Sequence, residues 1–72
     1  MELSILRRSM IQGFKLFDLD EQTILMLSLI LKKDWMADEM LDFMVDNPQA
    51  RKTDFVLKTI EITNKMERAN DI

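Results

Sequence analysis

The hydrophobic positions of this chain fall into four segments, and the second segment has the strongest pattern. Residues 23–31 read TILMLSLIL, in which only Thr23 and Ser28 interrupt the apolar side chains. At roughly 100° per residue, these side chains point in all directions around a helix. A helix that is apolar on every side must be covered on every side. We therefore expect residues 19–33 to form the central helix of a small bundle.

The segment before it, residues 2–16, carries a narrower hydrophobic stripe. Apolar side chains recur there at spacings of three and four, which predicts a helix with one buried face. Gly13 flanks this stripe, and it either admits a close neighbour or ends the helix early. Asp18 is expected to cap the next helix, with Glu21 completing a capping box. The members of the stripe are Leu3, Leu6, Met10, Phe14 and Phe17.

The third segment, residues 35–46, divides into an apolar side and an acidic side. Asp34 precedes it as the expected N-cap, and Trp35 lies in the first turn towards the acidic side. This division predicts a helix with one face in the core and the other in solvent. The acidic side comprises Asp38, Glu39, Asp42 and Asp46, and the apolar side comprises Met36, Ala37, Met40, Leu41, Phe43 and Met44.

The fourth segment predicts a long C-terminal helix over residues 48–69, or a shorter one that begins after a Thr53 cap. Its body carries two apolar faces, whereas a helix in a small monomer usually buries one. The second face has the spacing of a coiled-coil seam. Either the first helix covers this face, or it is a contact surface for a second copy of the chain. The second face consists of Phe55, Thr59, Ile62, Met66 and Ala69.

Together the segments predict an all-α fold, a bundle of three or four helices that forms a single domain over residues 1–72. The composition agrees, because 47% hydrophobic and 32% charged side chains with one glycine and one proline are typical of a folded helical protein. The core of so small a domain supplies only about 3–5 kcal/mol, and such domains often gain stability by association. There is no cysteine to form a disulfide.

The residue types argue against an enzyme. The chain has no His, Cys or Tyr, so the common nucleophile–base pairs cannot be assembled. Asp18 and Asp20 have the spacing of the first two ligands of a calcium loop, but Thr23 and Leu29 stand where that loop needs Gly and Glu. We expect no catalytic residue, no metal, no cofactor and no small-molecule substrate.

The charge is unevenly distributed along the chain. The formal net charge is −3, and residues 18–46 carry eight acidic against two basic side chains. This segment therefore has a net charge of −6, and the remaining segments sum to +3. An acidic surface favours a basic protein partner over nucleic acid. We expect Trp35, Asp38 and Asp42 to contact such a partner.

A helix-turn-helix that binds DNA is the alternative. Residues 35–46, a short turn and the following helix have the order and lengths of that motif. Arg51, Lys52 and Thr53, at the front of the second helix, would then reach base edges and phosphates. The carboxylates of the preceding helix oppose this interpretation, because affinity for DNA depends mainly on neutralising phosphates.

The sequence also bears on location. The longest apolar run, about nine residues, is far shorter than the ~20 needed to span a bilayer, and residues 1–17 lack the pattern of a signal peptide. We expect a cytoplasmic protein with no membrane contact. The predicted function is a non-enzymatic protein–protein interaction module, a small regulator or adaptor in a bacterial cell. Its partner is another protein, and a homodimer through the C-terminal helix is one of the open alternatives.

Overall fold

A computed structural model describes the backbone of residues 4–70 and the side chains of residues 4–65. These residues are helical apart from short connections, and the described part of the chain contains no strand. The all-α fold class is therefore confirmed. The last helix, with 19 residues, is the longest, as predicted. The four helices are α1 (Ile5–Leu16), α2 (Glu21–Ile30), α3 (Asp34–Asp46) and α4 (Lys52–Asn70).

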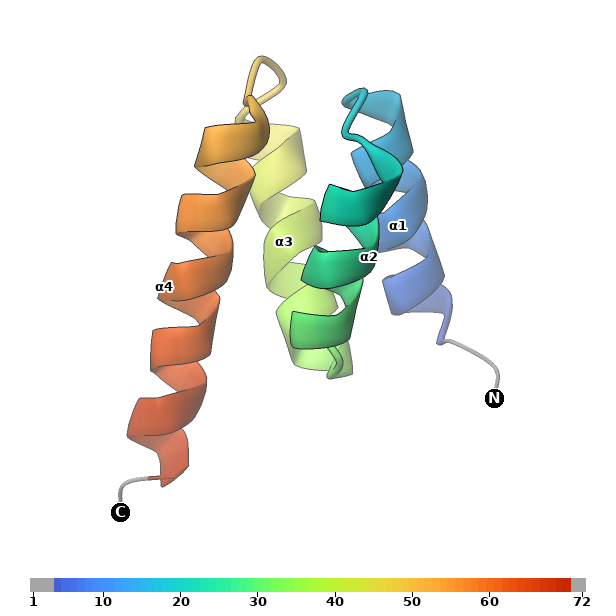
Figure 1. The fold of residues 1–72 in the computed structure, drawn as a ribbon. Helices are drawn as coiled ribbons and strands as arrows, with labels where there is room; N and C mark the ends of the chain where they lie inside the picture. The colour runs from blue at the N-terminus through green and yellow to red at the C-terminus, as the bar shows by residue number, and fades with distance from the viewer. Residues whose placement is uncertain (1–3, 71–72) are drawn as a thin grey trace.

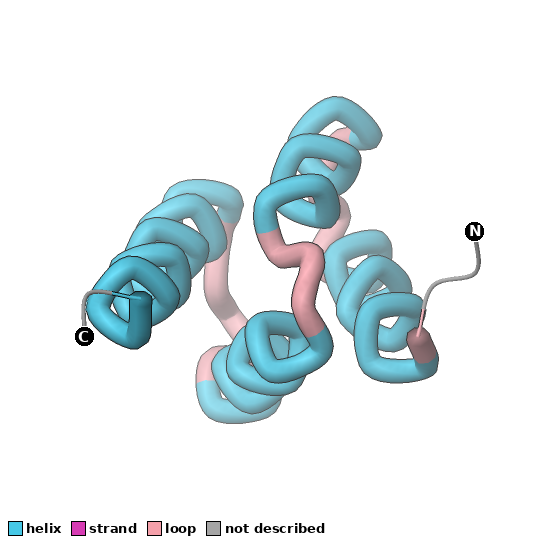
Figure 2. The backbone as a smooth tube through the Cα atoms, turned by 90° about the horizontal axis from the view of Figure 1, so that it is seen from below, coloured by secondary structure: helices cyan, strands magenta, loops and turns pink. Residues whose placement is uncertain are grey.

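The four helices are arranged in a ring. Consecutive helices run in alternating directions along the bundle (Figure 1). Helix α1 packs against α2 and α3, and α4 packs against the same two helices, so each helix has two neighbours (Figure 2). The α1–α3 contact is the most extensive. Helix α2 therefore lies across the ring from α3, and the described backbones of these two helices do not approach each other closely.

The core is built around an aromatic cluster. Phe55 of α4 has no exposed surface, and its ring packs edge-on against three other rings. The ring centroids of Phe14, Phe17 and Phe43 lie 5.7, 4.9 and 5.6 Å away. Edge-to-face pairs at such distances are favourable beyond their buried area. The other fully buried large side chains are Met10, Leu27, Leu31, Met36, Met40 and Ile62.

The helix starts differ from the predicted ones. Asp18 does not cap α2, because its backbone is left-handed, with a φ of 65°. Asp20 is the N-cap instead, and it accepts a hydrogen bond from the backbone N–H of Thr23. The third helix is preceded by Lys33, which makes no side-chain capping bond, and Asp34 is already helical.

The last helix begins at Lys52, between the two predicted starts. Residues 48–51 form a turn, closed by a hydrogen bond from the Ala50 N–H to the Asn47 carbonyl. The Asp54 carboxylate accepts from the backbone N–H of Arg51 at 2.9 Å. This is one half of a capping box, in which an acidic side chain in the first turn reaches back to the cap residue.

The expectation that the apolar segment of α2 is covered on every side is wrong. Thr23 and Leu27 face the core and are buried, as is Leu31 just after the helix. The opposite side of α2 faces outward, because a helix in this ring has neighbours on only two sides. Four large apolar side chains are exposed there: Leu25, Met26, Leu29 and Ile30.

Candidate interaction surface

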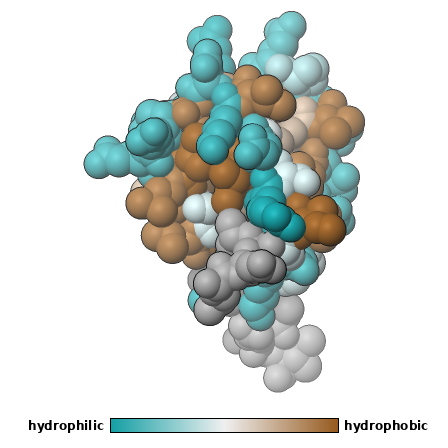
Figure 3. Space-filling model, turned by 90° about the vertical axis from the view of Figure 1, so that its right-hand side faces the viewer, coloured by the Kyte–Doolittle hydropathy of each residue, from teal (hydrophilic) through white to brown (hydrophobic). Residues whose placement is uncertain are grey.

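The outer face of α2 gathers four exposed large apolar side chains, more than any other helix has among the described side chains. The exposed fractions are 60% for Leu25, 50% for Met26, 68% for Leu29 and 40% for Ile30. The spacings of these residues, one, three and one, keep them on one side of a helix of only ten residues. We call these four residues the α2 apolar face. Figure 3, viewed from the α1 side, shows hydrophobic surface (brown) beside hydrophilic surface (teal).

The polar residues of α2 explain why this segment is helical although one apolar side faces water. The Asp20 carboxylate accepts from both the backbone N–H and the hydroxyl of Thr23, at 3.2 and 2.6 Å. Ser28 donates its hydroxyl to the carbonyl of Leu25 at 2.9 Å. The first pair stabilises the start of the helix. The second bond lies within the helix, so Ser28 needs no partner from a neighbour.

The two ends of α2 carry opposite charges. Asp20 and Glu21 are exposed at the start of the helix, and Lys32 and Lys33 are exposed just beyond its end. Asp20 also lies 3.4 Å from the Nζ atom of Lys52 at the start of α4. No ion pair among the described side chains includes Glu21, Lys32 or Lys33. The apolar face is thus flanked by an acidic end and a basic end.

The hydrogen bonds at the start of α2 also lower the pKa of the Asp20 carboxyl group. The Thr23 side chain, followed by the Thr23 backbone N–H, lowers the pKa of Asp20 to about 2, and Lys52 adds a smaller effect in the same direction. These donors favour the charged carboxylate. Asp20 therefore keeps its charge well below neutral pH.

The face of α4 that we predicted as a contact surface lies inside the protein. Phe55 and Ile62 have no exposed surface, and Thr59 is 4% exposed and donates its hydroxyl to the Phe55 carbonyl. The prediction that these three residues bind a second copy is therefore wrong in this fold, because the chain's own helices cover them. The side chain of Met66, the fourth residue of that prediction, lies outside the described residues.

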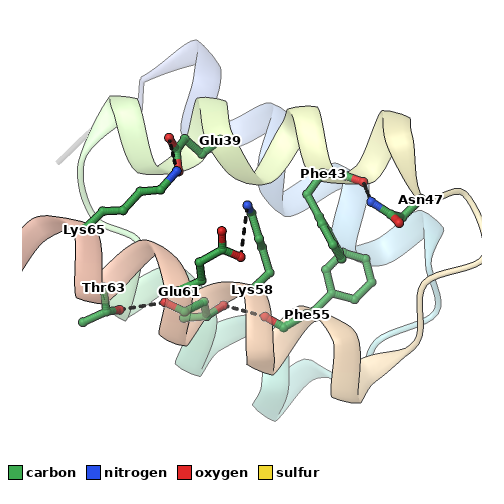
Figure 4. Close-up of polar contacts among 9 residues, drawn as sticks. Glu39, Phe43, Asn47, Phe55, Lys58, Glu61, Thr63 and Lys65 are labelled. Carbon is green, nitrogen blue, oxygen red and sulfur yellow. Dashed lines mark hydrogen bonds and ion pairs between the residues drawn. The ribbon is translucent and has the colours of Figure 1, made fainter.

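The contact between α3 and α4 is polar along its outer edge. Lys65 donates to both carboxylate oxygens of Glu39 at 3.0 Å (Figure 4). Lys58 of α4 lies 5.8 Å from the centre of the Phe43 ring and 3.4 Å from the Glu61 carboxylate. The Lys65–Glu39 pair links α3 to α4 along this edge, and the charged side chains there already have partners within the chain.

The outward side of α4 is apolar at Leu57 and Ile60, which are exposed. Together with Glu61, Asn64 and Lys65 they line a shallow, open depression. Three polar or charged side chains and two apolar side chains form a mixed surface, less apolar than that of α2. Scattered exposed apolar residues of this kind are common on protein surfaces.

The acidic residues of α3 lie where the sequence predicted. Trp35, Asp38 and Asp42 are all exposed on the outer side of α3, and Val45 continues this row. The structure brings them onto one face, at spacings of three and four. Their proposed contact with a basic partner stays a prediction.

The residues of the DNA-binding alternative lie at the start of α4. Arg51, Lys52 and Thr53 are exposed, and Lys52 is paired with Asp20. Helices α3 and α4 run side by side in opposite directions (Figure 1), whereas the two helices of a helix-turn-helix cross at about 90–120°. This geometry does not favour DNA recognition through the front of α4.

The described residues hold no group of three or more His, Cys, Asp or Glu side chains placed to bind a metal ion. None of the helices that the structure describes has the length and apolarity needed to cross a membrane. Comparisons with protein families, with curated proteins and with solved structures found no match.

The sequence contained a signal for the α2 apolar face that we read differently. All four residues lie in the run that was expected to be buried. Such a run can mean either a helix that is buried on every side or a helix with one apolar side exposed. The number of helices decides between them: in a ring of four, each helix has two neighbours, and its outer side stays uncovered. An all-round apolar helix in so short a chain therefore indicates a surface as well as a core.

Proposed function

We propose that this protein is a non-enzymatic interaction module that binds another protein through the α2 apolar face. The observation that carries this proposal is the exposure of four large apolar side chains, by 40–68%, on one side of a ten-residue helix. Complete burial of such a side chain is worth about 1.5–3 kcal/mol. Contiguous apolar surface with a polar rim is typical of interaction sites.

The same proposal includes a role as a small cytoplasmic regulator or adaptor, in a bacterial cell. Support for this part comes from the sequence alone: the small size, the lack of cysteine and the lack of residues for common catalysis. The acidic outer face of α3 stays a second predicted contact, for a basic partner. The α2 apolar face is favoured because its exposure costs free energy in the isolated chain, whereas exposed carboxylates are well solvated.

Photo-crosslinking in the cell that expresses the protein tests the proposal. A photoreactive amino acid replaces Leu29 in one version and Leu57, which is 59% exposed on α4, in the control version. We expect position 29 to capture a discrete protein that position 57 does not capture. Adding Leu25→Ser to the first version should weaken this capture, because it removes neighbouring apolar surface. Identical products from positions 29 and 57 would argue against a docking role for α2.

A further inference from the structure

The charges around the α2 apolar face suggest which partner covers it. One short helix carries carboxylates at its start, at Asp20 and Glu21, and ammonium groups just past its end, at Lys32 and Lys33. When such a helix is placed against a copy of itself in the opposite direction, each acidic end meets a basic end. A parallel arrangement would instead place like charges together at both ends.

We propose that the partner is a second copy of this chain, and that the two α2 helices pair antiparallel across a twofold axis. This inference rests on the proposed function, since it names the occupant of the same surface. A twofold interface must be self-complementary, with one patch facing its own copy. The α2 surface meets this requirement, because its centre is apolar and its two ends have opposite charge.

The apolar residues and the charged ends of α2 both place the twofold axis near the middle of the helix. The four apolar side chains are centred between positions 27 and 28, and the charged ends are centred between positions 26 and 27. The two centres differ by one residue, which is about 1.5 Å along a helix. One axis therefore pairs the apolar side chains and the charged ends at the same time.

Most of the charged side chains at the two ends of α2 form no ion pair with other described side chains. The ion pairs of the described side chains do not include Glu21, Lys32 or Lys33. Only Asp20 is engaged, as the helix cap and with Lys52. The pairs across the dimer would be exposed at its rim, where such contacts set orientation more than affinity.

The size of the α2 apolar face limits the expected affinity of the dimer. A helix of ten residues is about 15 Å long, and it covers only part of the ~800 Å² per partner that a standard interface buries. We therefore expect a reversible dimer with a dissociation constant in the micromolar range rather than a permanent one.

Analytical ultracentrifugation of the full chain over a wide concentration series tests the proposal. The wild type should pass from monomer to dimer. Leu29→Glu should weaken association by at least about tenfold, because it places a carboxylate in the apolar centre. Leu57→Glu on α4, the same replacement at another exposed leucine, is the matched control and should leave association unchanged. Circular dichroism should show that both variants keep the wild-type helix content, since both replaced side chains are mostly exposed.

Charge reversal tests the direction of pairing. Glu21→Lys alone, and Lys33→Glu alone, each bring like charges together at both ends of an antiparallel pair. Each variant should dimerise about 3- to 10-fold more weakly than wild type at low salt. An equal mixture of the two should recover association, because the mixed dimer has opposite charges at both ends. If wild type and single variants associate equally, or the mixture gives no recovery, the antiparallel arrangement is wrong.

The two proposals fail separately. A wild type that stays monomeric at the highest concentration, or a dimer that Leu29→Glu does not weaken, overturns pairing through α2. If crosslinking at position 29 still captures a different protein, the proposed interaction function stands with another partner. If position 29 captures nothing specific, the proposed function falls as well.

Discussion

The sulfur of Met44 occupies the space in which a side chain at Gly13 would begin. A Cβ atom placed on Gly13 would overlap Sδ of Met44 and lie 2.9 Å from its Cε. Gly13 stands within α1, which continues to Leu16, so the glycine admits a close neighbour and does not end the helix. This contact lets α1 and α3 approach each other closely, and their packing is the most extensive in the bundle.

Replacing Gly13 by Ala should therefore be less favourable in the wild type than in a background without the Met44 side chain. In the wild type, the end of the flexible Met44 side chain must move aside. This movement offsets most or all of the gain of about 1 kcal/mol from the better helix propensity of Ala. In a Met44→Ala background the space is vacant, so the same change should stabilise the protein by about 1 kcal/mol.

Urea unfolding of the four proteins measures this difference. A stabilising osmolyte, at one concentration throughout, keeps the Met44→Ala variants folded, because that change alone costs about 2–5 kcal/mol. An equal effect of Gly13→Ala in both backgrounds would show that the two residues do not interact.

The sequence predicted the elements of the fold better than their arrangement. Four helices, the buried stripe at Met10 and Phe14, and the apolar side of α3 at Met36 and Met40 follow from hydrophobic spacing, which depends on local geometry alone. The order of helices around the ring depends on contacts between distant segments. Spacing within one helix contains no information about which neighbours cover it.

For this reason the sequence could not decide which of the two faces of α4 is buried. Both faces have helical spacing, and only the neighbours decide which one is buried. We expect Phe55→Leu to lower the free energy of unfolding by about 1–3 kcal/mol, because it removes an aromatic ring packed against three others. Leu57→Ala, at an exposed position of the same helix, should change it by no more than about 0.5 kcal/mol.

Chemical denaturation followed by circular dichroism compares these two variants. The contrast between them is the informative quantity, because both changes shorten an apolar side chain on α4. A larger loss for Leu57→Ala than for Phe55→Leu would mean that α4 buries the face that carries Leu57.

The candidate surface could be predicted only in part. Trp35, Asp38 and Asp42 are exposed as expected, since carboxylates at helical spacing are rarely buried. Leu25 and Leu29 were assigned to the core, because apolar side chains are expected inside. Sequence patterns are interpreted by the rule that apolar side chains are buried. An exposed apolar face breaks this rule, so it can be recognised only when the neighbours of the helix are known.

The hydrogen bonds from Thr23 to Asp20 predict a dependence on pH. The pKa of Asp20 is lowered to about 2 in the folded protein, whereas it is about 3.9 in an unfolded chain. The cap therefore contributes its full stabilisation above about pH 4 and loses it as the pH falls towards about 2. Asp20→Asn keeps a capping side chain but cannot titrate.

Thermal unfolding of wild type and Asp20→Asn at constant ionic strength tests this dependence. We expect the wild type to have the higher Tm at pH 6, and the difference to shrink between about pH 4 and pH 2. The other carboxylates titrate in both proteins, so the difference reports on Asp20. A difference that is constant over this range would contradict the lowered pKa.

The ion pair between Lys65 and Glu39 joins α4 to α3, with Nζ 3.0 Å from both carboxylate oxygens. Both side chains are partly exposed, so the pair is expected to contribute at most about 1 kcal/mol.

A double-mutant cycle with Glu39→Gln and Lys65→Met should give a favourable coupling energy at low salt. Glu61→Gln, which removes the Lys58 pair within α4, serves as the control for losing one carboxylate charge. At about 1 M salt, where charges are screened beyond about 3 Å, the coupling should fall towards zero. A coupling that is absent at low salt would show that apolar packing alone holds these two helices together.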